Sequence, residues 1–256
     1  MNGKDKRYIV DERKYAGDWV DKPKTGQGIF TWANGDRYEG QFKDKMMNGK
    51  GTCYFADGRK YTGDWVNNQK TGQGVFTWPN GDQYEGQFKG DKINGKGTCY
   101  FADGRKYAGD WIDENMKGQG VFTWTNGDRY EGQFRDNQIN GKGTCYFADG
   151  RQYTGDWVDE NKTGKGVFTW PNGDRYEGQF KGDKINGKGT CYFADGRKYT
   201  GDWVDENMTG KGVFIWPNGD RYKGQLKDGN MNGKGTLYYA NGQVQKGIWL
   251  NDTFIG

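Results

Sequence analysis

A 23-residue period runs through the chain and constrains its fold more than any other feature. Tyrosine marks the period at Tyr15, Tyr38, Tyr61, Tyr84, Tyr107, Tyr130, Tyr153, Tyr176, Tyr199 and Tyr222. A glycine follows each tyrosine after two residues, and a large side chain follows after four, with Trp and Phe alternating. Because no insertion breaks the register, the sequence predicts a stack of one 46-residue unit made of two similar halves.

Each 23-residue half shows the alternation of β-strands and not the period of a helix. Its first segment reads Tyr-x-Gly-x-(Trp/Phe), and its second reads Gly-x-Gly-x-(Phe/Cys)-x-(Trp/Phe). A period of two places the tyrosines, glycines and large rings on one face, which we call the ring face. Residues such as Glu39, Gln41, Lys50 and Thr52 then lie on the opposite face, the polar face. We therefore expect two strands per half and no helix.

The segments that join the strands predict how the strands pair. In Trp78–Asp82, Pro, Asn and Gly follow one another, which favours a three-residue hairpin loop with its glycine in the left-handed region. This loop places Phe76 opposite Tyr84 and Gly72 opposite Phe88. Each large ring is therefore expected to cover a glycine of the neighbouring strand.

The same register predicts ion pairs on the polar face. The expected pairs are Lys50 with Asp64, Lys96 with Asp110, Lys142 with Asp156, and Lys188 with Asp202. Exposed cross-strand pairs contribute about 0.2–1 kcal/mol each, so they adjust the pairing without driving it.

The whole chain is predicted to be one array of these hairpins, an elongated single-layer antiparallel sheet shaped as a twisted rod or half-pipe, with no helical domain. At about 4.8 Å between strands, the sheet would be on the order of 100 Å long. Residues 1–14 form a degenerate half-repeat at the N-terminal end, 15–221 the regular repeats, and 222–256 divergent repeats. Charges stand at ring-face positions of the first segment, at Asp5, Arg7 and Glu12.

Composition excludes several classes of protein. The chain has 256 residues, of which 16% are aromatic, and disordered chains lack so many rings. The net charge of +4 comes from charges scattered without runs, which argues against a nucleic-acid partner. No apolar stretch is long enough for a membrane helix or a secretory signal, so a cytoplasmic location is expected.

The residue inventory argues against an enzyme. The chain contains no His and no Ser, which removes Ser–His and Cys–His nucleophiles and metal sites that contain His. Acidic residues such as Asp18 and Glu39 recur in every second repeat, whereas a catalytic pair needs one asymmetric environment. We expect no catalytic residue, no metal and no cofactor.

The four cysteines are predicted to be packing residues. Cys53, Cys99, Cys145 and Cys191 are 46 residues apart, which is four strands or roughly 19 Å in the expected sheet. No two of them can form a disulfide or share a metal at that distance. Each takes the place that Phe holds in the alternate half-repeat, and free thiols agree with a reducing compartment.

The repeated unit, for example Tyr84–Phe88 followed by Gly95-Lys96-Gly97, resembles the MORN repeat (membrane occupation and recognition nexus) over essentially the whole of residues 1–256. The resemblance implies a twisted single-layer sheet with a ring-lined groove. It also implies a scaffold, as MORN proteins are in ciliary radial spokes, in protist cytoskeletal collars and beside membranes. Leu226 and Gln245 depart from the pattern, which concerns only the end geometry.

These observations predict a non-enzymatic scaffold that binds protein through an aromatic-lined groove, in a ciliary (axonemal, radial-spoke-like) or cytoskeletal assembly. A single-layer sheet leaves part of its ring face exposed, and such a patch marks an interface. The candidate partner-binding residues are Trp65, Trp78, Phe88, Trp111, Trp124, Phe134 and Trp157.

The expected occupant of the groove is a helix, an extended peptide or a second copy of the chain. The alternative function is a peripheral module that binds anionic phospholipids through lysine-bearing turns such as Lys89–Lys92. Nucleic acid is not expected, although rings beside lysines can stack single strands.

Overall fold

The computed structural model describes residues 8–10, 13–17 and 25–256, and within them the chain forms only strands and turns. Asp5, Arg7, Glu12 and Trp19, and with them most of the degenerate half-repeat predicted over 1–14, lie outside the described residues. No helix in the described part could span a membrane. The prediction of an all-β chain without a helical domain is confirmed for these residues.

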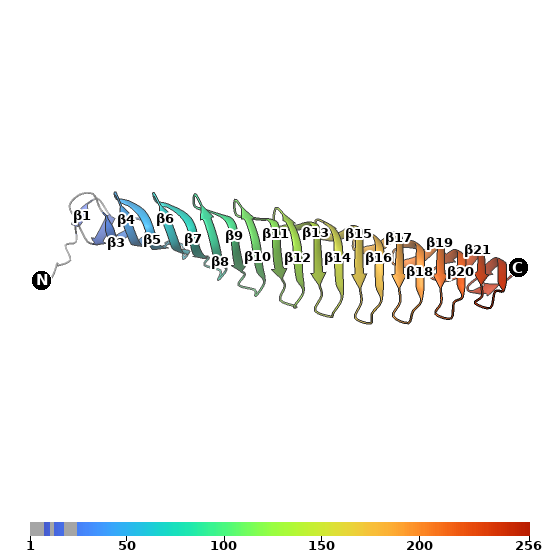
Figure 1. The fold of residues 1–256 in the computed structure, drawn as a ribbon. Helices are drawn as coiled ribbons and strands as arrows, with labels where there is room; N and C mark the ends of the chain where they lie inside the picture. The colour runs from blue at the N-terminus through green and yellow to red at the C-terminus, as the bar shows by residue number, and fades with distance from the viewer. Residues whose placement is uncertain (1–7, 11–12, 18–24) are drawn as a thin grey trace. The chain divides into compact units, whose positions relative to one another are not determined.

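The chain divides into two compact units, residues 1–125 with 135–137 and residues 126–134 with 138–256. The strands of the first unit are β1 (Tyr8–Val10), β2 (Arg13–Gly17), β3 (Gly26–Thr31), β4 (Arg37–Lys43), β5 (Met46–Tyr54), β6 (Lys60–Val66), β7 (Gln69–Thr77), β8 (Gln83–Lys89), β9 (Lys92–Tyr100), β10 (Lys106–Ile112) and β11 (Asn115–Thr123). Each pairs antiparallel with the next in sequence, which makes an open sheet of consecutive hairpins (Figure 1).

The second unit repeats this arrangement. Its strands are β12 (Arg129–Arg135), most of which belongs to this unit, β13 (Gln138–Tyr146), β14 (Gln152–Val158), β15 (Asn161–Thr169), β16 (Arg175–Lys181), β17 (Lys184–Tyr192), β18 (Lys198–Val204), β19 (Asn207–Ile215), β20 (Arg221–Lys227), β21 (Asn230–Tyr238), β22 (Val244–Leu250) and β23 (Thr253–Phe254). From β13 onward each strand pairs antiparallel with its successor. The divergent residues 222–256 keep this fold.

The three-residue loops adopt the predicted conformation. The N–H of Trp78 donates to the carbonyl of Asp82 at 2.9 Å, and the N–H of Gly81 donates to the carbonyl of Trp78 at 3.0 Å. Gly81 has a φ of 95°, in the left-handed region that the turn requires. The expected register follows, since Phe76 pairs with Tyr84 and Gly72 with Phe88.

The other connections are two-residue turns, which the sequence analysis did not assign. In the turn between β8 and β9, Gly90 has a φ of 56° and Asp91 a φ of 70°. Positive φ at both central residues defines a type I′ turn, whose twist matches that of the flanking strands. Each unit therefore alternates three-residue loops along one edge with two-residue turns along the other (Figure 1).

Beside each two-residue turn the sheet contains a bulge that the sequence analysis missed. Gly86 pairs with Gly97 and Phe88 with Ile93, so Gln87 alone faces the three residues 94–96. The side chain of Gln87 fills this irregularity, because its Oε1 accepts the N–H of Lys96 at 2.8 Å. The bulge bends the strand next to the turn.

The sequence predicts that a large ring of the neighbouring strand covers the first glycine of each Gly-x-Gly pair. The bulge shows a different reason for this glycine. Gly95 does pair with Trp111, as predicted. A side chain at Gly95 would, however, meet Gln87 and not the tryptophan ring, and the φ of 108° at Gly95 disfavours any other residue. Its glycine is therefore required by the bulge.

Candidate protein-binding surface

The core of each unit is built on the ring face of a single sheet, around the repeated tyrosines. Tyr84 is fully buried, and its ring lies against Gly86 of its own strand and Gly97 of the next. Its hydroxyl donates to the carbonyl of Gln87 at 3.1 Å. Phe88 and Trp111 meet the Tyr84 ring edge-on, with centroids 5.3 and 5.4 Å away. Burial raises the pKa of Tyr84 to about 12, so this hydroxyl stays protonated and structural.

The tryptophans that follow the tyrosines are fixed in the same core. The Nε1 of Trp111 donates to the carbonyl of Gly97 at 3.2 Å, and Trp65 and Trp157 make the equivalent bonds to Gly51 and Gly143. These bonds satisfy the indole N–H groups inside the protein, where an unpaired donor would be costly.

Five of the seven predicted partner-binding residues are therefore core residues. Trp65, Phe88, Trp111, Phe134 and Trp157 have exposed fractions of 3%, 4%, 7%, 4% and 6%. The expectation that these rings stay in contact with water is wrong, because rings of successive strands pack edge to face and cover one another. Whether they contribute to binding stays a prediction.

Trp78 and Trp124, the other two predicted residues, lie elsewhere and are half-buried. Each stands immediately before a three-residue loop, at the edge of the ring face, and packs against the phenylalanine two residues before it with centroids 4.7 and 4.8 Å apart. Among the described residues, neither indole N–H has a hydrogen-bond partner, in contrast to Trp65 and Trp111. Both side chains are therefore partly exposed, and neither indole nitrogen is buried.

The same half-buried position is occupied by an aromatic ring before each of these loops, and we call this row the aromatic rim. Its members are Trp32, Phe55, Trp78, Phe101 and Trp124 in the first unit, and Phe147, Trp170, Phe193, Trp216 and Tyr239 in the second. The rim is therefore a partly exposed row of rings at the edge of the ring face.

The loops beside the rim carry regularly placed aspartates. The Oδ2 of Asp82 accepts from the Nδ2 of Asn80 at 3.0 Å, and its Oδ1 accepts from the N–H of Ala102 in the next loop at 2.8 Å. Both partners are neutral amides, and no cation in the described part of the chain forms an ion pair with Asp82. In the alternate loop Asp103 pairs with Arg105 at 2.8 Å, and hydrogen bonds from Arg105 lower the pKa of Asp103.

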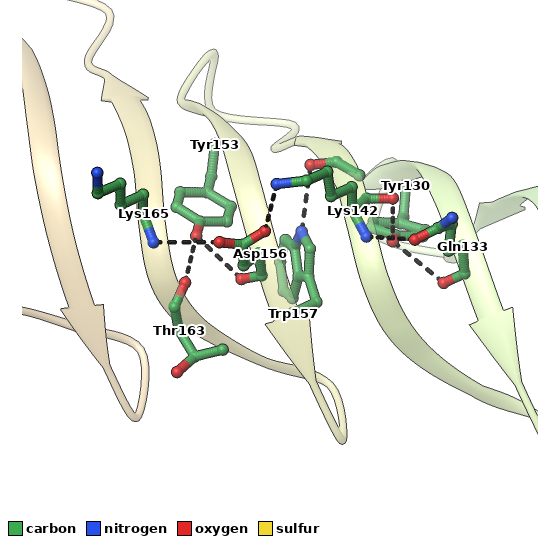
Figure 2. A network of polar contacts seen from close by, with 9 residues as sticks. Tyr130, Gln133, Lys142, Tyr153, Asp156, Trp157, Thr163 and Lys165 are labelled. Carbon is green, nitrogen blue, oxygen red and sulfur yellow. Dashed lines mark hydrogen bonds and ion pairs between the residues drawn. The ribbon is translucent and has the colours of Figure 1, made fainter.

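The polar face contains the predicted ion pairs inside a larger network (Figure 2). The Nζ of Lys142 lies 2.7 Å from Oδ1 of Asp156, while Oδ2 of Asp156 accepts the N–H of Lys165 at 3.2 Å. The side chain of Gln133 accepts the N–H of Lys142 at 2.8 Å. Asp and Gln therefore alternate as caps of the bulges, one in each 23-residue half. All four predicted Lys–Asp pairs are present.

A hollow lies over the glycines on the polar face of the first unit. It crosses strands β3 to β8, and its lining includes Ile29, Glu39, Thr52, Thr62, Val75 and Glu85. Small side chains and bare glycine backbone form its floor, with Lys50 and Gln73 beside them. It is open and of mixed polarity, and none of its described lining residues is aromatic.

The sequence analysis missed a second set of aromatic residues, which lie on the polar face. Tyr54, Tyr100, Tyr146 and Tyr192 are 37–41% exposed. Basic side chains flank them, as when the Nζ of Lys60 lies 5.3 Å from the ring centroid of Tyr54. Strict alternation could have found them, since each directly follows a ring-face cysteine.

The cysteines are buried free thiols, as predicted. Burial raises the pKa of each of the four thiols to about 11, with a nearby aspartate adding to the effect. Within the described residues no cluster of Cys, Asp and Glu could hold a metal ion.

A sheet built of similar hairpins, each covering its own glycines with its own rings, defines an open β-repeat protein. A family model described as the MORN repeat matches the chain ten times, at residues 15–37, 38–58, 61–83, 84–104, 107–129, 130–150, 153–175, 176–196, 199–221 and 222–244. The chain belongs to the MORN repeat family. No curated protein has a matching sequence.

Among solved structures, the chain is similar to the TCP domain of SAS-4 (dCPAP) from Drosophila melanogaster, in complex with a proline-rich motif of Ana2. The identity is 16%, over 68% of this chain and 87% of that one, with a TM-score of 0.40. The TCP10 domain of CPAP from Danio rerio, in complex with a peptide of STIL, is 15% identical over 88% of this chain and 95% of that one, with a TM-score of 0.29. Both are distant structures.

Proposed function

We propose that this chain is a non-enzymatic scaffold that binds an extended segment of a partner protein along its aromatic rim. The observation that supports this most strongly is the contrast between two sets of tryptophans. Those in the core, such as Trp111, have their N–H groups bonded to glycine carbonyls, whereas those of Trp78 and Trp124, at the edge of the sheet, have no partner among the residues that the structure describes. Half-exposed Trp side chains with free donors are typical of protein interfaces.

The assembly that we propose is cytoskeletal, in the cytoplasm, with the ciliary axoneme and its radial spokes as the first place to look. Membership of the MORN repeat family supports a scaffold role. Purification of the tagged chain from ciliated cells, followed by mass spectrometry, tests this proposal. Repeated recovery of the same axonemal or cytoskeletal proteins is expected, and recovery of none would contradict it.

Binding to anionic phospholipids is the competing function, and the two-residue turns argue against it. Their lysines are partly neutralised by acids of neighbouring turns, as in Lys92 with Asp113 at 3.6 Å and Lys184 with Asp205 at 3.6 Å. Co-sedimentation with neutral and anionic vesicles separates the two functions. Binding to the anionic vesicles alone, together with loss of that binding in Lys92→Glu, would favour the lipid function.

A further inference from the structure

The spacing of the aromatic rim suggests what kind of chain it accommodates. Consecutive rim residues are two strands apart, so at about 4.8 Å between strands their rings repeat about every 9.6 Å. A polyproline II helix has three residues per turn and rises about 3.1 Å per residue, so it presents the same side every 9.3 Å or so. The two periods differ by about 0.3 Å. A segment with proline at every third position therefore stays in register with the five rim rings of the first unit, Trp32 to Trp124.

Other peptide conformations fit this spacing less well. An α-helix returns to the same side after seven residues, about 10.5 Å, and drifts from the rings by about 0.9 Å at each step. In an extended strand every third residue points to the opposite side. The backbone groups inside each sheet are also already paired with neighbouring strands, as in β6 with β7 and β7 with β8, so a strand laid across them would lack partners.

The chemistry of the rim complements that of polyproline II. This helix makes no internal hydrogen bonds, so its carbonyls are free to accept from a surface. Within the described part of the chain, Trp78 and Trp124 offer rings for proline and unpaired indole N–H groups for those carbonyls, whereas the guanidinium of Arg105 lies over the Phe101 ring between them, 5.0 Å from its centroid. Aromatic grooves recognise proline-rich segments in this way.

The charge of the loops beside the rim indicates which residues the partner segment carries besides proline. The four rim loops of the first unit contain four aspartates, Asp36, Asp57, Asp82 and Asp103, against two arginines, Arg59 and Arg105, for a net charge of −2. Each arginine pairs with the aspartate of its own loop. Asp36 and Asp82 bond to amides and form no ion pair within the described residues, and the amine of Lys70 is the basic group beside this row, 5.9 Å from the ring centroid of Phe55. We propose that the aromatic rim binds a basic, proline-rich segment in the polyproline II conformation; this inference rests on the proposed function and specifies its partner.

The tryptophans supply an internal control for the test. The probe is a 13-residue synthetic peptide with proline at every third position and arginine at intervening positions, added to the whole 256-residue chain labelled with ¹⁵N. The indole N–H signals of the rim tryptophans, Trp32, Trp78, Trp124, Trp170 and Trp216, are expected to shift on titration. Those of Trp65, Trp111, Trp157, Trp203 and Trp249, which donate to glycine carbonyls, are expected to stay in place.

Two control peptides decide the chemistry of recognition. Replacement of every proline by glycine is expected to weaken binding at least tenfold, and replacement of every arginine by glutamate to abolish the shifts. Absence of shifts with the proline–arginine peptide, shifts of both classes of tryptophan, or equal affinity for the glycine peptide would each overturn the inference.

Variants separate this inference from the proposed function. Trp78→Ala with Trp124→Ala is expected to weaken peptide binding at least tenfold, while Tyr100→Ala, next to the rim but on the polar face, leaves it within twofold. Trp78→Phe with Trp124→Phe keeps an aromatic ring at both positions, and its affinity for the peptide is expected to lie between those of the other two variants. A cellular partner that binds the wild-type chain without any proline-rich segment would sink the inference alone. Failure to recover any partner would sink the proposed function as well.

Discussion

The ring of Tyr84 lies so close against the backbone of Gly97 on the neighbouring strand that a Cβ atom at Gly97 would overlap its phenol carbons. The same ring blocks a side chain at Gly86, whose Cα faces that of Gly97. One tyrosine therefore covers two glycines on two strands, and each hairpin carries its own part of the core. This relationship explains why tyrosine and glycine keep the 23-residue period so strictly.

The first prediction concerns Gly97. Gly97→Val is expected to lower the free energy of unfolding by at least about 2 kcal/mol, because the new side chain has no space beneath Tyr84. Thr98→Val, one residue further on but on the polar face, is the matched control and should cost less than about 0.5 kcal/mol. Urea denaturation followed by tryptophan fluorescence measures both. Equal shifts in the two midpoints would show that the faces are assigned wrongly.

Strand pairing could be predicted from the sequence because two independent signals agree. The Pro-Asn-Gly order of the loops fixes one register, and the alternation of rings and polar residues fixes the same one. The pairing of Gly72 with Phe88 and of Lys96 with Asp110 followed directly.

The bulges and the burial of the rings could not be derived in the same way. A bulge at Gln87 leaves no trace in the alternation, since its two additional residues keep the phase of the strand. Exposure of the ring face depends on how far the rings of successive strands overlap, as Trp111 does with Tyr84. The alternation of residues predicts the face on which a ring lies, but not how far that ring overlaps the rings of the next strand. That residues 1–256 form one array stays a prediction.

A half-buried lysine beside the aromatic core gives the second prediction. The Nζ of Lys70 lies 5.0 Å from the ring centroid of Phe76 and 5.9 Å from those of Phe55 and Tyr61. The equivalent residue 46 positions later is Met116, which is buried. Burial lowers the pKa of the Lys70 amine, which shows that the charged form is disfavoured there. Lys70→Met is therefore expected to stabilise the protein by about 1 kcal/mol at neutral pH.

The pH dependence of that gain tests its cause. Because the pKa of Lys70 is lower in the folded than in the unfolded state, the unfolded chain binds more protons between the two values, and wild-type stability rises with pH in that window. The gain from Lys70→Met should thus shrink as the pH approaches about 10, near the ordinary lysine value. Lys162→Met is the control, and its gain should be smaller because Lys162 keeps an ion pair with Asp183 at 3.1 Å. A gain that does not change with pH would contradict the desolvation account.

The third prediction separates charge from capping at Asp110. Its Oδ1 pairs with Lys96 at 2.8 Å and its Oδ2 accepts the N–H of Gln119 at 3.0 Å. Asp110→Asn keeps an acceptor for that N–H and should cost only about 0.5 kcal/mol, because the lysine is well exposed. Asp110→Ala leaves the bulge without its cap and should cost about 1–2 kcal/mol.

Acid should remove the difference in stability between wild type and Asp110→Asn. The Lys96 bond, followed by the bond from Gln119, lowers the pKa of Asp110 in the folded state. Its charge therefore contributes stability above about pH 3.9, the unfolded value, and that contribution is lost as the pH falls through the folded pKa. Thermal unfolding of the two proteins between pH 2 and pH 7 checks this. A difference that persists at pH 2 would mean that the charge is not its source.

The fourth prediction concerns the thiols. Burial keeps the pKa of Cys99 and Cys145 near 11, so almost no thiolate exists at pH 8. Iodoacetamide is expected to leave all four cysteines unmodified in the native protein and to alkylate all four in urea, as measured by mass spectrometry. Rapid modification of one cysteine in the native state would indicate a reactive site instead of a packing residue.

Binding through the aromatic rim is tested most directly by comparing variants of the two faces. Trp78→Ala with Trp124→Ala changes the rim, and Lys96→Glu with Asp110→Lys reverses an ion pair on the polar face. Wild type and both variants, each confirmed as folded, are used to capture partners from the same cell extract, followed by quantitative mass spectrometry. The rim variant is expected to lose at least nine-tenths of the partners that wild type captures, and the charge-reversed variant to keep them. Loss of partners by the charge-reversed variant, with full capture by the rim variant, would place binding on the polar face and contradict the account.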